Sequence, residues 1–223
     1  MSSFFADEIK GNYAYIKNPD ELKHLKVKRI KIGEPVSLID GKGSLFFTIF
    51  EFLDKKQAKF SILQTKKEYY RVLKTFYIGF TDLKRMELIA EKAGEMGVKS
   101  FAFFRGEKTA KYLKAPDVNK IKKRIMSGMK QSENPNFPDF LGSYDSLEDI
   151  SLTENTIVLT PGGKLSLSEN IPEVNNVIIG AKEGFSKREV EYFEKSGIIT
   201  ANLGNSIFRV ETAFIIASFL FKS

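Results

Sequence analysis

The chain has 223 residues, 42% of them hydrophobic and none of them cysteine, and its formal net charge is +7. This length and composition suit an ordinary globular protein with a sizeable core, and the lack of cysteine excludes disulfides, thiolate metal sites and thiol nucleophiles. The single histidine, His24, argues against a transition-metal site and against a Ser-His-Asp hydrolase, so no metal site is predicted. The basic balance favours an anionic partner, nucleic acid first.

The two ends of the chain predict neither a targeting segment nor a membrane span. Residues 1–10 carry acidic side chains and no long apolar stretch, which does not fit a signal or transit peptide. The most apolar run, residues 213–221, is shorter than the roughly 20 residues that cross a bilayer, so we interpret it as a buried helix. Together with the missing cysteine, this pattern is compatible with a cytoplasmic protein.

The first part of the chain, residues 1–68, reads as a small β-barrel or sheet. Short apolar segments occupy residues 36–39, 44–52 and 58–64, and Asp40 and nearby glycines supply a turn between the first two. Alternating patterns with glycine turns and few helix signals are typical of such a domain.

The second part, residues 69–223, alternates apolar strands with helical segments. The predicted strands are 72–80, 98–104, 156–160, 177–180 and 198–203, and the predicted helices before the C-terminal one are 84–97, 117–131 and 186–196. Ser186 and Glu189 form a capping box that marks the start of the last of these helices. This order predicts an α/β domain with a parallel sheet and helices on both faces. Residues 131–146, rich in Pro, Gly, Asn and Ser, are predicted to be a long functional loop.

Three glycine-containing loops follow predicted strands, at residues 159–163, 180–186 and 203–209. Open α/β sheets bind ligands at the carboxyl ends of their strands, and glycine lets the backbone approach an adenine or a ribose closely. Each loop alone fits a plain turn, but three on consecutive strands favour a site. None of them matches the dinucleotide or P-loop pattern, which argues against nicotinamide or ATP phosphate binding.

The segment "NVIIGAKEGFSKREVEYFEKSGIITANLGNSIFRVETAFIIAS", residues 176–218, resembles the RsmE family of SPOUT-class methyltransferases. The matches to the family's Gly-Pro-Glu-Gly-Gly-Phe loop and its Leu-Gly-x-x-Ile-Leu-Arg-x-Glu-Thr-Ala segment are Gly180, Gly184, Phe185, Leu203, Gly204, Ile207, Arg209, Glu211, Thr212 and Ala213. Upstream, residues 85–98, the Gln131-Ser132 pair and His24, Val27 and Arg29 are also similar to family motifs.

The resemblance implies methylation of N3 of a uridine in 16S ribosomal RNA, with S-adenosylmethionine as cofactor and the RNA or the small ribosomal subunit as partner. It also implies an N-terminal PUA-like barrel that holds RNA, a C-terminal trefoil knot around the cofactor, and a homodimer. The cofactor-binding residues it implies are Leu159, Thr160, Pro161, Ile179, Gly180, Gly184, Leu203, Gly204, Ser206, Ile207, Phe208 and Thr212. The RNA-binding residues it implies are Lys23, His24, Lys26, Arg29, Arg85 and Gln131.

The chain departs from the family pattern at three places. Residues 181–183, Ala-Lys-Glu, replace Pro-Glu-Gly, so that Lys182 stands at the family's carboxylate position. Asn134 stands where the family usually has an arginine, and Phe208 replaces a leucine.

Arg209 is the candidate catalytic residue. Uridine N3 carries a proton that must leave before methyl transfer, and a guanidinium can stabilise the resulting anion without changing its own protonation. The alternative is a structural ion pair with Glu211 or Glu183. No general base is evident from the sequence.

Two basic segments have a second interpretation. Residues 23–31, with five cations and no acid, are expected to grip phosphates or to form a solvated basic face. For Lys120, Lys122, Lys123 and Arg124 the solvated helix face is favoured.

The alternatives to an RNA methyltransferase are a non-catalytic RNA-binding or ribosome-assembly protein that kept the fold, and an unrelated α/β enzyme for another nucleotide.

Overall fold

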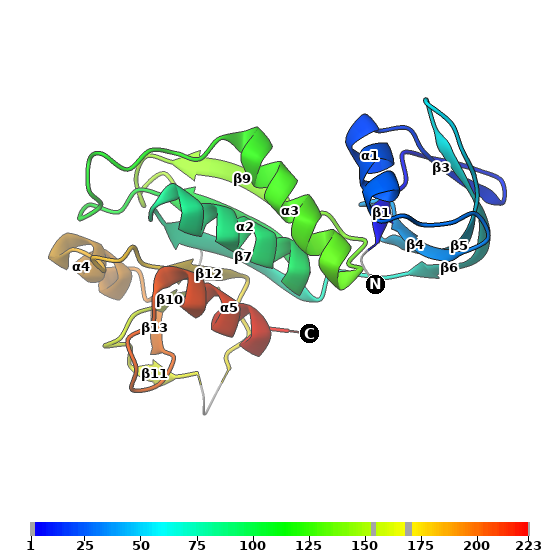
Figure 1. Ribbon diagram of the computed structural model, residues 1–223. Helices are drawn as coiled ribbons and strands as arrows, with labels where there is room; N and C mark the ends of the chain where they lie inside the picture. The colour runs from blue at the N-terminus through cyan, green and yellow to red at the C-terminus, as the bar shows by residue number, and fades with distance from the viewer. Residues whose placement is uncertain (1–2, 153–154, 168–170, 223) are drawn as a thin grey trace.

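The computed structural model describes residues 3–152, 155–167 and 171–222, and it contains two sheets that lie end to end (Figure 1). The N-terminal sheet has six strands in the order β1-β4-β5-β6-β3-β2. Its strands are β1 (Phe4–Phe5), β2 (Glu8–Lys10), β3 (Tyr13–Ile16), β4 (Pro35–Ile39), β5 (Ser44–Leu53) and β6 (Ala58–Lys67). Within the described residues, β1 and β2 at its two edges do not pair with each other, so the expected barrel takes the form of an open half-barrel.

Helix α1 (Pro19–Val27) packs into this half-barrel, and the sequence pattern did not predict it. Its start is well specified, because the Asn18 side chain accepts hydrogen bonds from two backbone N–H groups of the first turn and Pro19 follows directly. Leu22 and Leu25 lie in the same apolar cluster as Phe60. The helix is short and highly charged, and only one narrow face is apolar, which hid its periodicity.

The C-terminal sheet has seven strands in the order β11-β13-β10-β12-β7-β8-β9, and every neighbouring pair is parallel. Its strands are β7 (Val72–Gly79), β8 (Val98–Phe104), β9 (Asp139–Tyr144), β10 (Thr156–Leu159), β11 (Leu165–Ser166), β12 (Asn176–Ile179) and β13 (Ile199–Asn202). The parallel sheet predicted from the alternation of strands and helices is confirmed.

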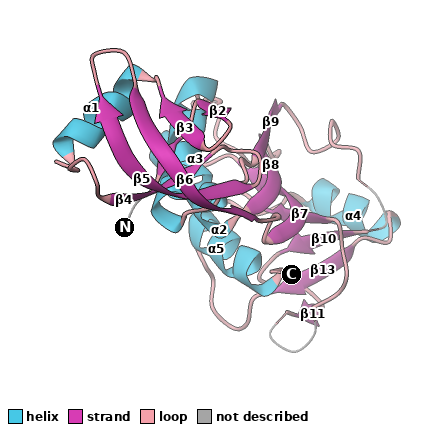
Figure 2. Cartoon of the chain, turned by 90° about the vertical axis from the view of Figure 1, so that its right-hand side faces the viewer, coloured by secondary structure: helices cyan, strands magenta, loops and turns pink. Residues whose placement is uncertain are grey.

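Helices cover both faces of this sheet (Figures 1 and 2). Helices α2 (Leu83–Met96), α3 (Val118–Ser132) and α5 (Val210–Leu220) lie on one face, and α4 (Lys187–Lys195) lies on the other. Successive side chains of β12 point to opposite faces of the sheet and contact different helices. Val177 packs in the cluster that holds Met86 and Phe214, whereas Ile178 packs in the cluster that holds Phe193 of α4.

The sequence pattern placed these helices well. The predicted apolar seam of α2, which includes Ile89 and Ala93, is fully buried, and both halves of the capping box between Ser186 and Glu189 are present at the start of α4. None of the helices in the described ranges combines the length and the apolarity that a bilayer crossing demands.

The predicted long loop at residues 131–146 is wrong in its second half, which contains strand β9. This strand is at the edge of the sheet, and within the described part of the chain β8 is its only partner strand. Its side chains alternate between exposed and half-buried, and Gly142 lies in the left-handed region, at φ 97°. An edge strand of this kind lacks the continuous apolar run that marks a central parallel strand.

The two sheets are joined by a polar junction. The Lys130 ammonium at the end of α3 lies 2.6 Å from the carboxylate of Glu21 in α1, and Glu21 is only 4% exposed. The Asn136 side chain donates to the backbone carbonyl of Glu68 at 3.2 Å, and the Gly43 N–H donates to the carbonyl of Pro135 at 2.9 Å. These bonds fix the N-terminal half-barrel against the C-terminal domain.

Candidate functional site

The three predicted loops meet at one edge of the C-terminal sheet. Strands β13, β10 and β12 are neighbours, so the loops that follow them emerge side by side from the carboxyl edge. Together they surround a cavity of about 450 Å³. The predicted cofactor residues that line it are Leu159, Thr160, Pro161, Ile179, Gly180, Gly184, Leu203, Ser206, Ile207 and Phe208.

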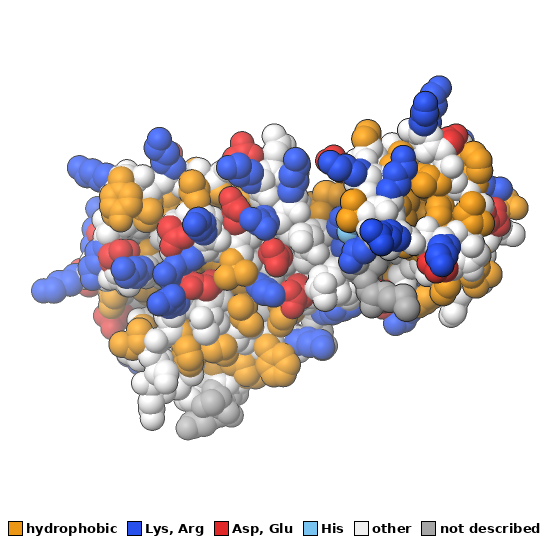
Figure 3. Space-filling view, in the orientation of Figure 1, with side chains coloured by type: hydrophobic (Ala, Val, Ile, Leu, Met, Phe, Trp, Pro, Cys, Tyr) orange, Lys and Arg blue, Asp and Glu red, His pale blue; other side chains and the backbone are white. Residues whose placement is uncertain are grey.

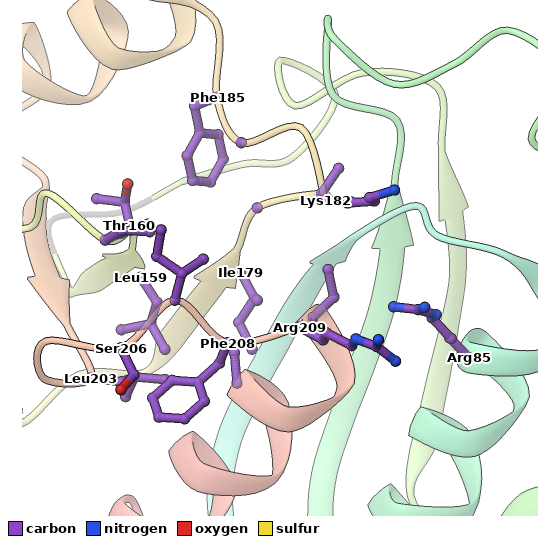
Figure 4. A pocket seen from close by; sticks show the side chains of 17 residues that line it. Arg85, Leu159, Thr160, Ile179, Lys182, Phe185, Leu203, Ser206, Phe208 and Arg209 are labelled. Atoms are coloured by element: carbon purple, nitrogen blue, oxygen red, sulfur yellow. The ribbon is translucent and has the colours of Figure 1, made fainter.

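The floor of the cavity is apolar and its mouth is open. Leu159 and Ile179, at the ends of β10 and β12, are only 6% and 3% exposed. Phe208 and Ile207 at the mouth are 37% and 83% exposed, and Figure 4 shows the Phe208 ring beside Leu203 and Ser206. A flat apolar group can therefore enter between the loops.

Two residues predicted to bind the cofactor, Gly204 and Thr212, are not among the residues that line the cavity. Gly204 is a turn residue whose N–H donates to the Asn202 side chain at 3.0 Å. Thr212 lies in α5 next to Ala213, which does line the cavity.

Among the described residues that line the cavity, the charged side chains are all cations, namely Arg85, Lys182 and Arg209. Their charged ends lie on the same side of the view in Figure 4, opposite Leu159 and Thr160. The family resemblance implied RNA binding for Arg85 but did not predict its position at this cavity. It implied no role in binding for Lys182, which is a departure from the family motif. Further lining residues without a predicted role are Ala181, Phe185, Val210 and Ala213.

Arg209 is the N-cap residue of α5, and its side chain makes no capping hydrogen bond. The alternative role of Arg209 was an ion pair with Glu211 or Glu183, but Glu211 pairs with Arg85 at 3.5 Å. Arg85 also pairs with Asp82 at 2.7 Å. In the part of the chain that the structure describes, no ion pair involves Arg209. Its guanidinium donors are thus available to a ligand in the cavity.

The loop at residues 180–186, which departs from the family motif, places its lysine and its glutamate differently relative to the cavity. Lys182 lines the cavity, whereas Glu183, one position later, is exposed and does not line it. The carboxylate that reappears at Glu183 therefore does not take the place of the family's carboxylate in the lining.

Asn134, which stands where the family usually has an arginine, is completely buried. Its side-chain amide donates to the carbonyls of Gly94 and Asn136 at 2.8 and 3.0 Å. Its oxygen accepts from the Asn136 N–H at 3.1 Å. The residue supports the end of α2 and the junction between the sheets, and it does not reach the molecular surface.

The remaining RNA candidates lie away from the cavity, on α1, just after it, and at the end of α3. Lys23, Lys26, Arg29 and Gln131 are exposed, and Figure 3 shows basic side chains gathered over α1. The His24 ring lies 5.0 Å from the Phe4 ring. Burial lowers the pKa of His24, and the nearby Lys130 ammonium lowers this pKa further.

The basic residues of α3 differ from those of α1, because acidic and basic side chains alternate over α2 and α3 in Figure 3. Arg124 donates to the Glu87 carboxylate of α2 at 2.9 and 3.0 Å and lies 3.7 Å from that of Glu91. This pairing fits the solvated helix face that the sequence favoured.

A family model described as an RNA methyltransferase domain matches residues 70–222. The chain belongs to the RNA methyltransferase family. A second model, described as an RNA methyltransferase PUA domain, matches residues 16–63, within the N-terminal half-barrel. This RNA methyltransferase thus combines a PUA domain with a parallel sheet, and the cavity lies at the carboxyl ends of the strands of that sheet.

Named relatives of this RNA methyltransferase agree with the family assignment. The chain is 29% identical to ribosomal RNA small subunit methyltransferase E of Aquifex aeolicus over 225 residues, covering 96% of both chains. It is 27% identical to the protein of that name from Buchnera aphidicola, covering 96% of this chain and 89% of the other. The resemblance to the RsmE family is confirmed by these relatives.

A solved structure shares the fold. Ribosomal RNA small subunit methyltransferase E of Neisseria gonorrhoeae, bound to S-adenosyl methionine, superposes with a TM-score of 0.81 at 20% identity. The match covers 98% of this chain and 95% of the other.

Proposed function

We propose that this RNA methyltransferase transfers a methyl group from S-adenosylmethionine to N3 of a uridine in 16S ribosomal RNA. The observation that carries the proposal is the cavity at the carboxyl edge of β13, β10 and β12, with the Arg209 guanidinium in its lining. Support also comes from the names of the relatives, which are small-subunit ribosomal RNA methyltransferases.

The cavity fits the cofactor. Its volume of about 450 Å³ lies within the range of about 300 to 1,000 Å³ that is common for cofactor sites. Leu159, Ile179, Leu203 and Phe208 provide apolar surfaces for an adenosine, and the loop backbone can recognise its polar edges. When bound, S-adenosylmethionine supplies an activated methyl group, so proximity and orientation account for much of the catalysis.

Arg209 is proposed to stabilise the uracil once its N3 proton has left. The negative charge of the deprotonated base spreads onto the carbonyl oxygens, which accept hydrogen bonds from a guanidinium. The described residues that line the cavity include no carboxylate and no imidazole, so we infer that the proton passes to water. Arg209 is therefore an electrostatic catalyst and not a base.

The N-terminal unit, residues 1–68, is proposed to position the RNA for the catalytic unit, residues 69–223. Lys23, Lys26 and Arg29 are exposed and can contact phosphates without reading bases. His24 and Gln131, together with Arg85 at the cavity, complete the proposed RNA contacts. The junction of Glu21 with Lys130 then fixes the distance between this basic surface and the cavity.

We also infer a trefoil knot and a homodimer acting in the cytoplasm. Strand β13 lies between β10 and β11, which are two ends of one connection, and a Cβ on Gly163 of that connection would lie 2.1 Å from the backbone of Ala201 in β13. Such close passage is what threading of β13 through the connection requires. The homodimer is supported by Phe219 of α5, a large apolar side chain that is 67% exposed. Light scattering of the purified protein, which measures its molar mass in solution, tests the dimer.

The proposal is tested by comparing ribosomal RNA from the parent organism with RNA from a strain that lacks this chain. Mass spectrometry of nucleosides should show that one N3-methyluridine of 16S RNA is lost in the deletion strain and restored by the wild-type gene. Unchanged uridine methylation would contradict the proposal and favour a non-catalytic role in assembly. Calorimetry with S-adenosylmethionine separates the proposal from an α/β enzyme for another nucleotide, which would not bind it.

A further inference from the structure

Lys182 is the feature of the cavity that neither the family motif nor the proposed chemistry explains. It occupies the family's carboxylate position with the opposite charge, and it lines the cavity. In the residues that the structure describes, no ion pair involves Lys182.

The loop holds Lys182 in place. The Gly184 N–H donates to the carbonyl of Ala181 at 2.9 Å, which closes a turn with Lys182 at its second position, and Gly184 has the positive φ of 68° that glycine favours. On one side Ala181 is only 8% exposed. On the other, the capping box of Ser186 begins α4. The backbone of Lys182 is therefore held by a short turn anchored at both ends, and its side-chain nitrogen lies on the side of Arg85 and Arg209 in Figure 4.

The charge of the cavity identifies the ligand of Lys182 as an anion. Among the described lining residues the three charged ones are cations, whereas the cofactor carries a positive sulfonium and offers a single carboxylate. Arg85, already a proposed RNA contact, also pairs with Asp82 and Glu211, and Arg209 is assigned to the uracil. Of these three lining cations, Lys182 is the one to which no ligand has been assigned.

We propose that Lys182 binds a backbone phosphate of the RNA segment that carries the target uridine. This inference rests on the proposed function, since it takes the substrate to be RNA. An ammonium on a flexible stem suits a phosphate as a point charge. The contact holds the nucleotide at the mouth of the cavity, so Lys182 is a positioning residue for the RNA and takes no part in the transfer itself.

The test measures RNA binding as a function of salt. Fluorescence anisotropy with a 16S ribosomal RNA transcript, at several KCl concentrations, compares the wild type with Lys182→Ala, Lys182→Glu and Lys99→Ala. Lys99 is exposed near the start of β8, and it therefore lies at the amino ends of the parallel strands, whereas the cavity lies at their carboxyl ends. Both alanine variants remove one lysine and change the net charge equally, so Lys99→Ala controls for overall charge.

Lys182→Ala should weaken RNA binding about threefold to tenfold and reduce the slope of log K against log salt by about 0.7 to 0.9, the value for one phosphate contact. Lys182→Glu should weaken binding further, and Lys99→Ala should leave the slope unchanged. An unchanged slope in Lys182→Ala would overturn the inference.

A second readout separates the RNA phosphate from the carboxylate of the cofactor's methionine moiety, the other oxyanion that could reach this lysine. Calorimetry with S-adenosylmethionine should give the same affinity for Lys182→Ala and the wild type. A loss of cofactor affinity with RNA binding intact would assign Lys182 to the cofactor and overturn the inference. If wild-type protein binds the transcript but transfers no methyl group, the proposed function fails while the salt slopes still decide the role of Lys182.

Discussion

Replacing Asn134 with alanine tests whether this residue, at a position where the RsmE family usually has an arginine, supports the fold or contacts RNA. The side chain is 0% exposed and makes three hydrogen bonds, two to carbonyls at 2.8 and 3.0 Å and one to an N–H at 3.1 Å. The carbonyl of Gly94 lies in the last turn of α2, where carbonyls have no partner within the helix. Asn134 therefore caps α2 from the segment that follows α3.

The cost of Asn134→Ala follows from the groups it leaves unpaired. Each buried polar group without a partner costs about 1 to 3 kcal/mol, and some of the three will find water. We expect the free energy of unfolding to fall by about 3 to 5 kcal/mol, which lowers the melting temperature by about 6 to 20 °C for a chain of this size.

Thermal unfolding followed by circular dichroism measures this shift, with Asn119→Ala as the control. Asn119 is exposed in the first turn of α3, the helix that Asn134 follows, so its removal should change stability by no more than about 0.5 kcal/mol. At low temperature, Asn134→Ala should bind RNA with the same salt dependence as the wild type. A loss under about 1 kcal/mol, or a reduced salt slope, would refute the structural role.

Three further variants probe the junction, the titration of histidine and the cavity wall. Lys130→Met should lower stability by about 2 to 4 kcal/mol in urea unfolding, because it leaves the Glu21 carboxylate buried without its cation; a neutral result would contradict this. The pKa of His24 is lowered in the fold, so the unfolded chain binds the proton more readily and stability falls as pH drops through about 6.5. His24→Asn should flatten that fall in unfolding curves between pH 7.5 and 5, and an unaltered pH profile would exclude the effect. Phe185→Ala removes a ring that lines the cavity and lies 5.0 Å from the Phe193 ring; calorimetry should show about tenfold weaker cofactor binding, and full affinity would remove Phe185 from the site.

The elements that the sequence predicted correctly are those whose own pattern determines them. The α2 seam, with Ile89 and Ala93 fully buried, follows from helical periodicity, and Ser186 marks the start of α4 through its cap. The cavity could be anticipated because the carboxyl ends of parallel strands meet at one edge. Because the three loops follow neighbouring strands, they meet at the same place and form the cavity there.

The elements that the sequence missed depend on tertiary neighbours. Helix α1 is stabilised by packing into the half-barrel, and β9 by pairing with β8. The direction of Lys182 into the cavity, and of Glu183 away from it, depends on the turn that Gly184 closes. The structural role of Asn134 could not be predicted from the family motif, because a motif shows which residue is replaced and not whether its position is buried.

The central claim is tested most directly by supplying purified protein with S-adenosylmethionine that carries a deuterated methyl group and with 16S ribosomal RNA. Mass spectrometry of the digested RNA should find the label on N3 of one uridine. Arg209→Ala should lower the rate by about 10² to 10³ and bind the cofactor as the wild type does. Label on another atom, no label with wild-type protein, or full activity in Arg209→Ala would contradict the account.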